Sequence, residues 1–104
     1  MSKPIRTEEE ADAELAEALD RYEEKRPGLG HDFLAAVDDV LQRISRFPKS
    51  GAAVPKAPAH LAARRVPVER FPYHIVYLDT PDAIRVLAFA HNRRRPFYWI
   101  SRST

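Results

Sequence analysis

The sequence predicts an α+β fold in which an N-terminal antiparallel helix hairpin packs on a small, mainly antiparallel sheet. Two observations lead to this class. Apolar residues recur with a helical period in two consecutive segments of the first half, and three β-like runs separated by short turns follow in the second half. Helical and strand segments are therefore segregated along the chain, as in two layers around one core. A length of 104 residues predicts one domain over residues 1–104.

The first helix is predicted to begin at the acidic run TEEE of residues 7–10. Thr7 is the expected N-cap, Glu10 can reach back to its backbone N–H, and the carboxylates favour the positive end of the helix dipole. The side of the helix opposite its apolar face is predicted to face solvent and carries Glu14, Glu17 and Glu24. Its apolar face continues for about five turns and consists of Ala11, Leu15, Ala18, Leu19 and Tyr22.

The second helix follows the sequence PGLG at residues 27–30. Proline breaks a helix and glycine adopts positive φ angles, so these four residues predict a tight turn between helices. The periodic run after the turn ends before Phe47 and Pro48. Two amphipathic helices with a short joint form a hairpin whose apolar faces partly cover each other. The face of the second helix contains Phe33, Leu34, Val37, Val40, Leu41 and Ile44.

Three strands are predicted over residues 63–70, 73–78 and 84–91. The segment 47–63 before them is rich in proline and alanine and is predicted to be a loop. Short turns at 71–72 and 79–82 make consecutive antiparallel strands, a meander, the simplest arrangement. Residues 3–6 can add a short edge strand, where a proline is tolerated.

The middle strand is apolar at nearly every position and has one polar side chain, His74. This composition predicts a central strand that either is covered on both faces or has a semi-apolar open face. In the preceding strand, alternation places Arg64 and Arg70 on one face and Arg65 on the other.

The net charge of +2 is an average over two unlike halves. Residues 1–52 carry 8 basic and 12 acidic side chains, whereas residues 53–104 carry 9 basic and 3 acidic ones. A basic second half favours an anionic partner, either nucleic acid or an acidic protein segment.

The sequence lacks the residues that several classes of chemistry require. The chain has no cysteine, which excludes disulfides, thiolate zinc sites and a cysteine nucleophile, and its four histidines lack metal-ligand spacing. The glycines at 28 and 30 lie between helices, so they do not form a phosphate-binding loop. We therefore expect no metal and no cofactor. Since the sequence also lacks a membrane-spanning apolar run and a signal peptide, we expect a cytoplasmic protein without membrane contact.

The most concentrated feature is a run of three arginines at 93–95 followed, after Pro96, by three aromatic side chains. Guanidinium groups pair with anionic oxygens and aromatic rings stack on bases, so this run suits nucleic acid, and it equally suits an acidic protein. The alternative is a solvated arginine turn whose aromatic rings plug the open end of the sheet. The binding candidates are Arg64, Arg70, Arg93, Arg94, Arg95 and Trp99. Those of the first strand, Arg64 and Arg70, are second choices, as is Arg65 between them.

A metal-independent ribonuclease is a second interpretation of the same region. Such an enzyme needs a base, an acid and cations close together, because it deprotonates a 2′-hydroxyl and stabilises a charged phosphorane. His74, His91 and Tyr98 supply the acid and base types, and the arginines supply the cations. Whether these groups converge is left open by the sequence.

The order of these motifs resembles the RelE/ParE superfamily of bacterial toxins. The resemblance runs from about residue 7 to residue 99 and rests on the acidic helix hairpin, RFP at 46–48, RFPYHIVY at 70–77, VLAFAHNRR at 86–94 and YW at 98–99. It implies the toxin half of a type II toxin–antitoxin, or plasmid stabilisation, module, held in a hetero-oligomeric complex by a cognate antitoxin. RelE-like members cleave messenger RNA on the ribosome, whereas ParE-like members poison DNA gyrase.

Departures from the nuclease pattern favour the ParE-like branch. Nuclease members tend to have an arginine after the aromatic residue of the central strand, where this chain has His74 after Tyr73. They also tend to have a basic residue next to the end of the last strand, where this chain has His91 and Asn92; Tyr98 matches a catalytic tyrosine. Gyrase poisoning is therefore the first prediction. A ribosome-dependent mRNA endoribonuclease and an inactive homologue that only binds antitoxin are the alternatives.

Overall fold

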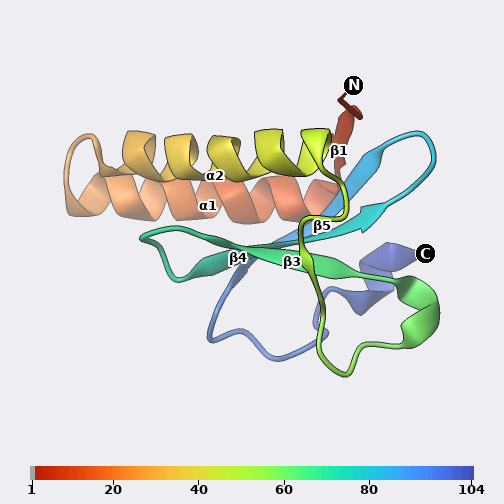
Figure 1. The fold of residues 1–104 in the computed structure, drawn as a ribbon. Coiled ribbons are helices and arrows are strands. Elements are labelled where there is room, and N and C mark those ends of the chain that lie inside the picture. Colours follow the sequence, from red (N-terminus) through yellow and green to blue (C-terminus); the bar gives the residue numbers. More distant parts are fainter. Residues whose placement is uncertain (1) are drawn as a thin grey trace.

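The computed structural model describes residues 2–104 and places a helix hairpin on one side of a five-stranded sheet (Figure 1). The strand order is β1-β5-β4-β3-β2, with β1 parallel to β5 and all other neighbours antiparallel. The predicted α+β class, the meander and the N-terminal edge strand are confirmed. The elements are β1 (Ile5–Thr7), α1 (Glu9–Lys25), α2 (Leu29–Arg46), β2 (Ala52–Ala53), the 3-10 helix η1 (Ala59–Leu61), β3 (Arg64–Val68), β4 (Tyr73–Asp79), β5 (Ile84–His91) and the 3-10 helix η2 (Ile100–Ser103).

Helix α1 begins differently from the prediction. Thr7 is not the N-cap, because it belongs to β1 and pairs with Val86 of β5. The N-cap is Glu8, whose backbone N–H donates to the Val86 carbonyl at 3.0 Å. Thr7 therefore belongs to the sheet, although the local sequence pattern predicts it as the N-cap of the helix.

The joint of the hairpin is shorter than predicted. Gly28 has a φ of +92° and makes the turn, but Gly30 lies inside α2 and does not take part in it. A Cβ atom at Gly30 would lie 2.9 Å from the Leu19 carbonyl oxygen of α1. Glycine at this position thus allows the two helices to approach each other closely.

The helix-facing side of the sheet holds the larger part of the core. Phe33 of α2 is fully buried, and its ring centroid lies 5.0 Å from that of Phe71 and 5.1 Å from that of Tyr73. Tyr77 of β4 is also fully buried, and its hydroxyl donates to the Pro48 carbonyl at 2.7 Å. We call this side the helix face of the sheet.

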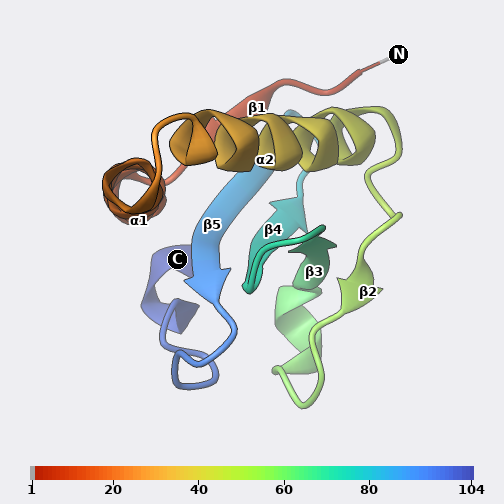
Figure 2. The ribbon, with the colours of Figure 1, turned by 90° about the vertical axis from the view of Figure 1, so that its left-hand side faces the viewer.

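The opposite side is covered by two irregular segments, one of which is the arm, residues 92–104. We call this side the arm face. In Figure 2 the C-terminal segment lies below β5 and the segment that contains η1 lies below β3. The loop predicted over residues 47–63 therefore contains two regular pieces, β2 and η1. Both faces of β4 are covered, since Ile75 packs toward the helices and Val76 packs toward the arm.

A β-bulge in the pairing of β4 with β5 sets which side chains reach each face. Val76 pairs with Ala88 and Tyr77 with Val86, so Leu87 is the extra residue. Leu87 and Ala88 consequently both pack on the arm face. No pattern in the sequence indicates this bulge.

Strand β3 ends at Val68, earlier than predicted. Arg70 therefore lies in the turn after the strand with a φ of +73°, and the predicted sharing of a strand face by Arg64 and Arg70 is wrong. The alternation of Arg64 and Arg65 holds within the strand. Arg64 donates to the carbonyl oxygens of Lys49 and Gly51, at 3.1 and 2.7 Å.

Candidate functional site

The residues after β5 form an arm, residues 92–104, that folds back beneath the arm face. Its main apolar anchor is Trp99, which is 3% exposed and packs in a cluster with Val76 and Leu87. Trp99 therefore has the packing role that the sequence left as one of two alternatives, and in this structure its ring is not a surface contact. Phe97 remains half-buried, with its ring centroid 6.2 Å from that of Trp99.

Glu14 of α1 ties the arm to the edge of β5. One carboxylate oxygen accepts hydrogen bonds from the Phe89 backbone N–H at 3.2 Å and from Arg102 Nη1 at 3.0 Å. The other oxygen accepts from the Tyr98 hydroxyl at 2.7 Å and from Arg102 Nη2 at 3.3 Å. Arg102 Nη1 also donates to the Leu87 carbonyl at 3.0 Å. A single carboxylate thus joins α1, the bulged strand and the arm.

The prediction that Glu14 faces solvent is wrong, because its side chain is only 15% exposed. A signal for this burial does exist in the sequence. Glu14 lies three residues after Ala11 and four before Ala18, both fully buried, and these spacings define one helix face. Its partners, Tyr98 and Arg102, lie too far along the chain for local patterning to find.

This network fixes the protonation of Tyr98. Burial, the hydrogen bond to Glu14 and the Glu14 charge all raise the pKa of Tyr98, in that order. Burial alone lowers the pKa of Arg102, but its hydrogen bond to Glu14 and the Glu14 charge outweigh burial and raise it. The Arg94 guanidinium carbon lies 3.9 Å from the centroid of the Tyr98 ring, a close cation–π contact. Tyr98 is therefore held neutral, with its proton directed at a carboxylate.

Between the arm and the segment beneath β3 lies a groove of about 340 Å³, which we call the basic groove. Its basic side chains come from five parts of the fold, and no Asp or Glu lines it. Apolar residues, among them Val54, Val76, Ala90 and Phe97, line it as well. The basic members are Lys56 of the loop after β2, Arg65 of β3, His74 of β4, His91 of β5, and Arg94 and Arg95 of the arm.

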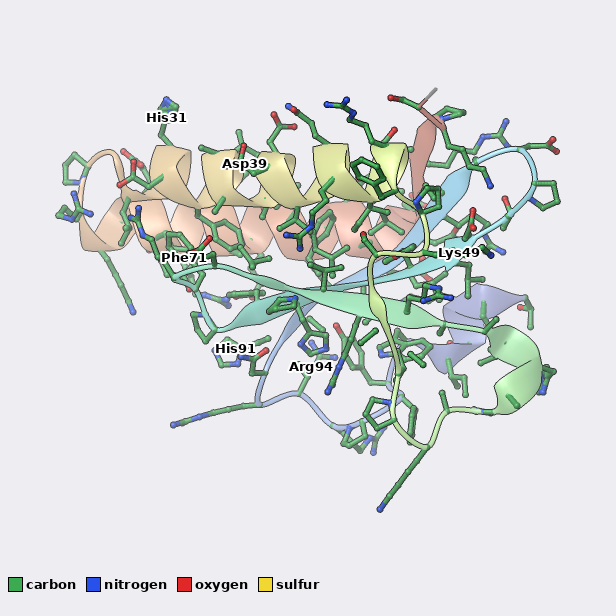
Figure 3. All side chains as sticks on the ribbon, in the orientation of Figure 1. His31, Asp39, Lys49, Phe71, His91 and Arg94 are labelled. Carbon is green, nitrogen blue, oxygen red and sulfur yellow. The ribbon has the colours of Figure 1, made fainter. Side chains whose placement is uncertain are left out.

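The four permanent cations of the basic groove are exposed and unpaired. In the structure of residues 2–104, none of Lys56, Arg65, Arg94 and Arg95 lies within ion-pair distance of a carboxylate. Figure 3 shows Arg94 on the side of the sheet opposite to α2. Asp39 and His31 project from α2 on the other side. Uncompensated like charges around one hollow favour an anionic occupant.

The two candidate histidines each have a structural partner. His74 Nδ1 lies 2.9 Å from the Asn92 side-chain oxygen, which links the centre of the sheet to the start of the arm. His91 Nδ1 accepts a hydrogen bond from the Arg93 backbone N–H at 3.1 Å, and its ring makes an edge contact with Tyr73 at 5.1 Å between centroids. These contacts hold the imidazoles in place as part of the fold.

The structure thus brings together some of the predicted site residues and separates the others. The basic groove gathers His74, His91, Tyr98, Arg94, Arg95 and Trp99, and it adds the secondary candidate Arg65. Lys56 was missed, because an isolated lysine in an alanine–proline loop carries no local signal. Arg64 and Arg70 lie elsewhere: Arg64 bonds the loop before β2, and Arg70 lines a separate hollow beside α2.

Arg93 belongs to a second cleft of about 470 Å³, which we call the α1 cleft. This cleft lies between the second half of α1 and the end of β5, and His91 and Arg94 line both it and the basic groove. Its lining includes the cations Lys25, Arg93 and Arg94, none of them in an ion pair among the described residues. It also includes three ion-paired side chains, Glu14, Glu17 and Arg21. The aromatic lining consists of Tyr22, Tyr73, Phe89 and His91.

Residues 2–104 contain neither a metal-binding cluster nor a membrane-spanning helix. No group of three or more His, Asp or Glu side chains in this part of the chain is placed to hold a metal ion. None of the described helices has the length and hydropathy needed to cross a bilayer.

Comparisons with known proteins identify relatives of the chain. A sequence model described as "ParE toxin of type II toxin-antitoxin system, parDE" matches residues 5–96. Among solved structures, a chain of the chromosomal ParDE toxin–antitoxin system from P. aeruginosa is similar, with a TM-score of 0.71 and 17% identity over 86% of this chain and 96% of that one. This likeness shows the shared fold. A search of the curated proteins finds no match.

Proposed function

Because the chain belongs to the ParE family of toxins of type II toxin–antitoxin systems, we propose that it arrests growth by poisoning DNA gyrase. A cognate antitoxin neutralises it by forming a hetero-oligomeric complex. The toxin acts in the cytoplasm as a single domain over residues 1–104 and uses no cofactor. The family supports the toxin role, and the state of the candidate catalytic groups supports the choice of gyrase.

The single observation that favours gyrase over RNA cleavage is that the Tyr98 hydroxyl, together with the Nδ1 atom of each candidate histidine, is already bonded within the fold. The Tyr98 hydroxyl donates to Glu14, His74 contacts Asn92, and His91 accepts from the Arg93 backbone. A general acid or base must exchange protons with a substrate. A toxin that acts by binding to an enzyme needs no such free group.

The antitoxin segment is proposed to occupy the α1 cleft. The cleft combines aromatic side chains with the cations of Lys25, Arg93 and Arg94, which suits an acidic segment that carries apolar side chains. The two carboxylates that also line it, Glu14 and Glu17, are already paired with arginines of the fold. Arg70 is a further proposed contact, in the hollow beside α2. Replacing Arg70 and the arginines at 93–95 with glutamate should abolish capture by a co-expressed antitoxin. Undiminished capture would overturn this placement.

Ribosome-dependent mRNA cleavage is the second candidate, because one observation favours it. The basic groove brings His74, His91 and Tyr98 together with Arg94 and Arg95, which are the residue types that phosphodiester cleavage needs. Under this mechanism His74→Ala would fold normally and lose codon-linked cleavage. The third candidate, an inactive homologue that binds only antitoxin, would cause no growth arrest when expressed alone.

The deciding experiment is controlled expression with a DNA-damage reporter and mapping of RNA ends in the same culture. We expect growth arrest, induction of the reporter and intact messenger RNA. Purified toxin should also stabilise cleaved DNA in a gyrase assay. Arrest with cut messenger RNA and a silent reporter would establish the nuclease alternative and refute the gyrase proposal.

A further inference from the structure

The charge of the basic groove is not required by the fold. Lys56, Arg65 and Arg95 are exposed, and none of their side chains makes an ion pair or a hydrogen bond in the structure of residues 2–104. Placing like charges around one hollow costs electrostatic free energy in the unliganded protein. An anionic ligand removes this cost, so the arrangement suits a binding site better than a packing role.

The lining of the groove indicates which anion it fits. Three of its four permanent cations are arginines, whose planar guanidinium groups bond phosphate oxygens in a fork. Below them lie Val76, Ala90 and the half-buried ring of Phe97, an apolar surface on which a base can rest. A nucleotide offers both features at once, a phosphate for the rim and a flat base for the floor.

The size of the groove selects a single strand. A volume of about 340 Å³ accommodates a small part of one strand, whereas a duplex would contact only the outer rim. The Tyr98 hydroxyl, which matches the position of a catalytic tyrosine, donates to Glu14 and is therefore not directed at a bound phosphodiester.

We propose that the basic groove binds single-stranded DNA, so that the toxin contacts DNA as well as protein when it acts. The choice of DNA over RNA rests on the proposed gyrase function, since a cleaved gyrase–DNA complex presents DNA strand ends. The cations at positions 65, 94 and 95 bind phosphates, and the floor at Phe97 supports a base. The α1 cleft, the proposed antitoxin site, adjoins the basic groove and shares His91 and Arg94 with it.

The test uses the purified full chain without gyrase and in the presence of a chelator. Fluorescence anisotropy measures binding of a labelled oligo-dT of about 12 nucleotides at low salt, with the matching oligo-rU as the RNA arm. The test variant is the double substitution Arg65→Gln and Arg95→Gln. The matched control is Arg43→Gln with Arg46→Gln, which removes the same charge from exposed positions on α2 that form no ion pair within residues 2–104. Circular dichroism confirms that all three proteins are folded.

We expect the groove variant to bind oligo-dT at least about 10-fold more weakly, because two phosphate contacts are lost. The slope of log K against log salt concentration should become shallower by about 1.4, since each contact on a single strand contributes about 0.7. The control should stay within about 2-fold of the wild type. Equal weakening in both variants, no binding by the wild type, or binding of oligo-rU about 10-fold tighter than oligo-dT would each overturn the proposal. Since gyrase is absent, this outcome is independent of the gyrase assay.

Discussion

The helix face and the arm face of the sheet are covered in different ways. Above the sheet, two long helices bury large side chains such as Phe33 and Ile44 completely. Below it, the arm and the loop after β2 cover only part of the surface and leave the basic groove. The same strands therefore serve as the stable core on one face and as a platform for exposed cations on the other. Substitutions on the two faces should separate stability from binding.

The largest expected effect is on the helix face. Phe33→Ala should lower the free energy of unfolding by about 4 kcal/mol, because it removes a fully buried ring that contacts Tyr22, Phe71 and Tyr73. Urea denaturation measures the change. The neighbouring Leu34 is 43% exposed, so Leu34→Ala is the control and should cost less than about 1 kcal/mol. Similar losses for both variants would contradict the described packing.

The next effect concerns the link between the two faces. Glu14→Ala should cost about 3 kcal/mol, because it leaves the Arg102 charge, the Tyr98 hydroxyl and the Phe89 N–H without their acceptor. Thermal and urea unfolding report the loss. The control is Glu17→Ala one turn later, which breaks only an exposed pair with Arg21 and should change stability by less than about 0.5 kcal/mol. A Glu14→Ala protein as stable as the control would refute the role of this network.

A smaller effect is expected in alkaline solution. The unfolded chain releases the Tyr98 proton near the ordinary pKa of about 10, whereas the native protein retains it because its pKa is raised. The native state then binds more protons, so the free energy of unfolding falls as the pH rises above that value. Tyr98→Phe should make this fall shallower. Burial also raises the pKa of Tyr22. Its contribution to the fall in the free energy of unfolding therefore remains in the Tyr98→Phe variant.

The smallest change in stability is expected from the basic groove itself. Arg65→Gln combined with Arg95→Gln should leave the free energy of unfolding within about 0.5 kcal/mol of the wild type, since both side chains are exposed and unpaired among residues 2–104. Chemical denaturation checks this. A loss of several kcal/mol would mean that these arginines hold the fold together, and the contrast between the faces would fail.

Much of the fold follows from local patterns, and the site follows only in part. Helical periodicity predicted both helices, and short apolar runs between turns predicted the three long strands. Thr7 was assigned wrongly because a parallel pairing with Val86 competes with its capping of α1. Glu14 was assigned to solvent because the groups that bury it lie at the other end of the sequence. The groove combines Lys56 with Arg65, and only the tertiary fold brings these two residues to one hollow.

The pairing of Ile5 with Ile84 has a consequence for when the protein acquires its shape. The α1–α2 hairpin forms from contacts close in sequence, so it can fold early during synthesis. Strand β5 lies inside the sheet, between β1 and β4, yet it is among the last elements to be made. The nascent chain therefore carries its helices long before it has a closed sheet, and the basic groove exists only after the arm has been synthesised and tied to Glu14.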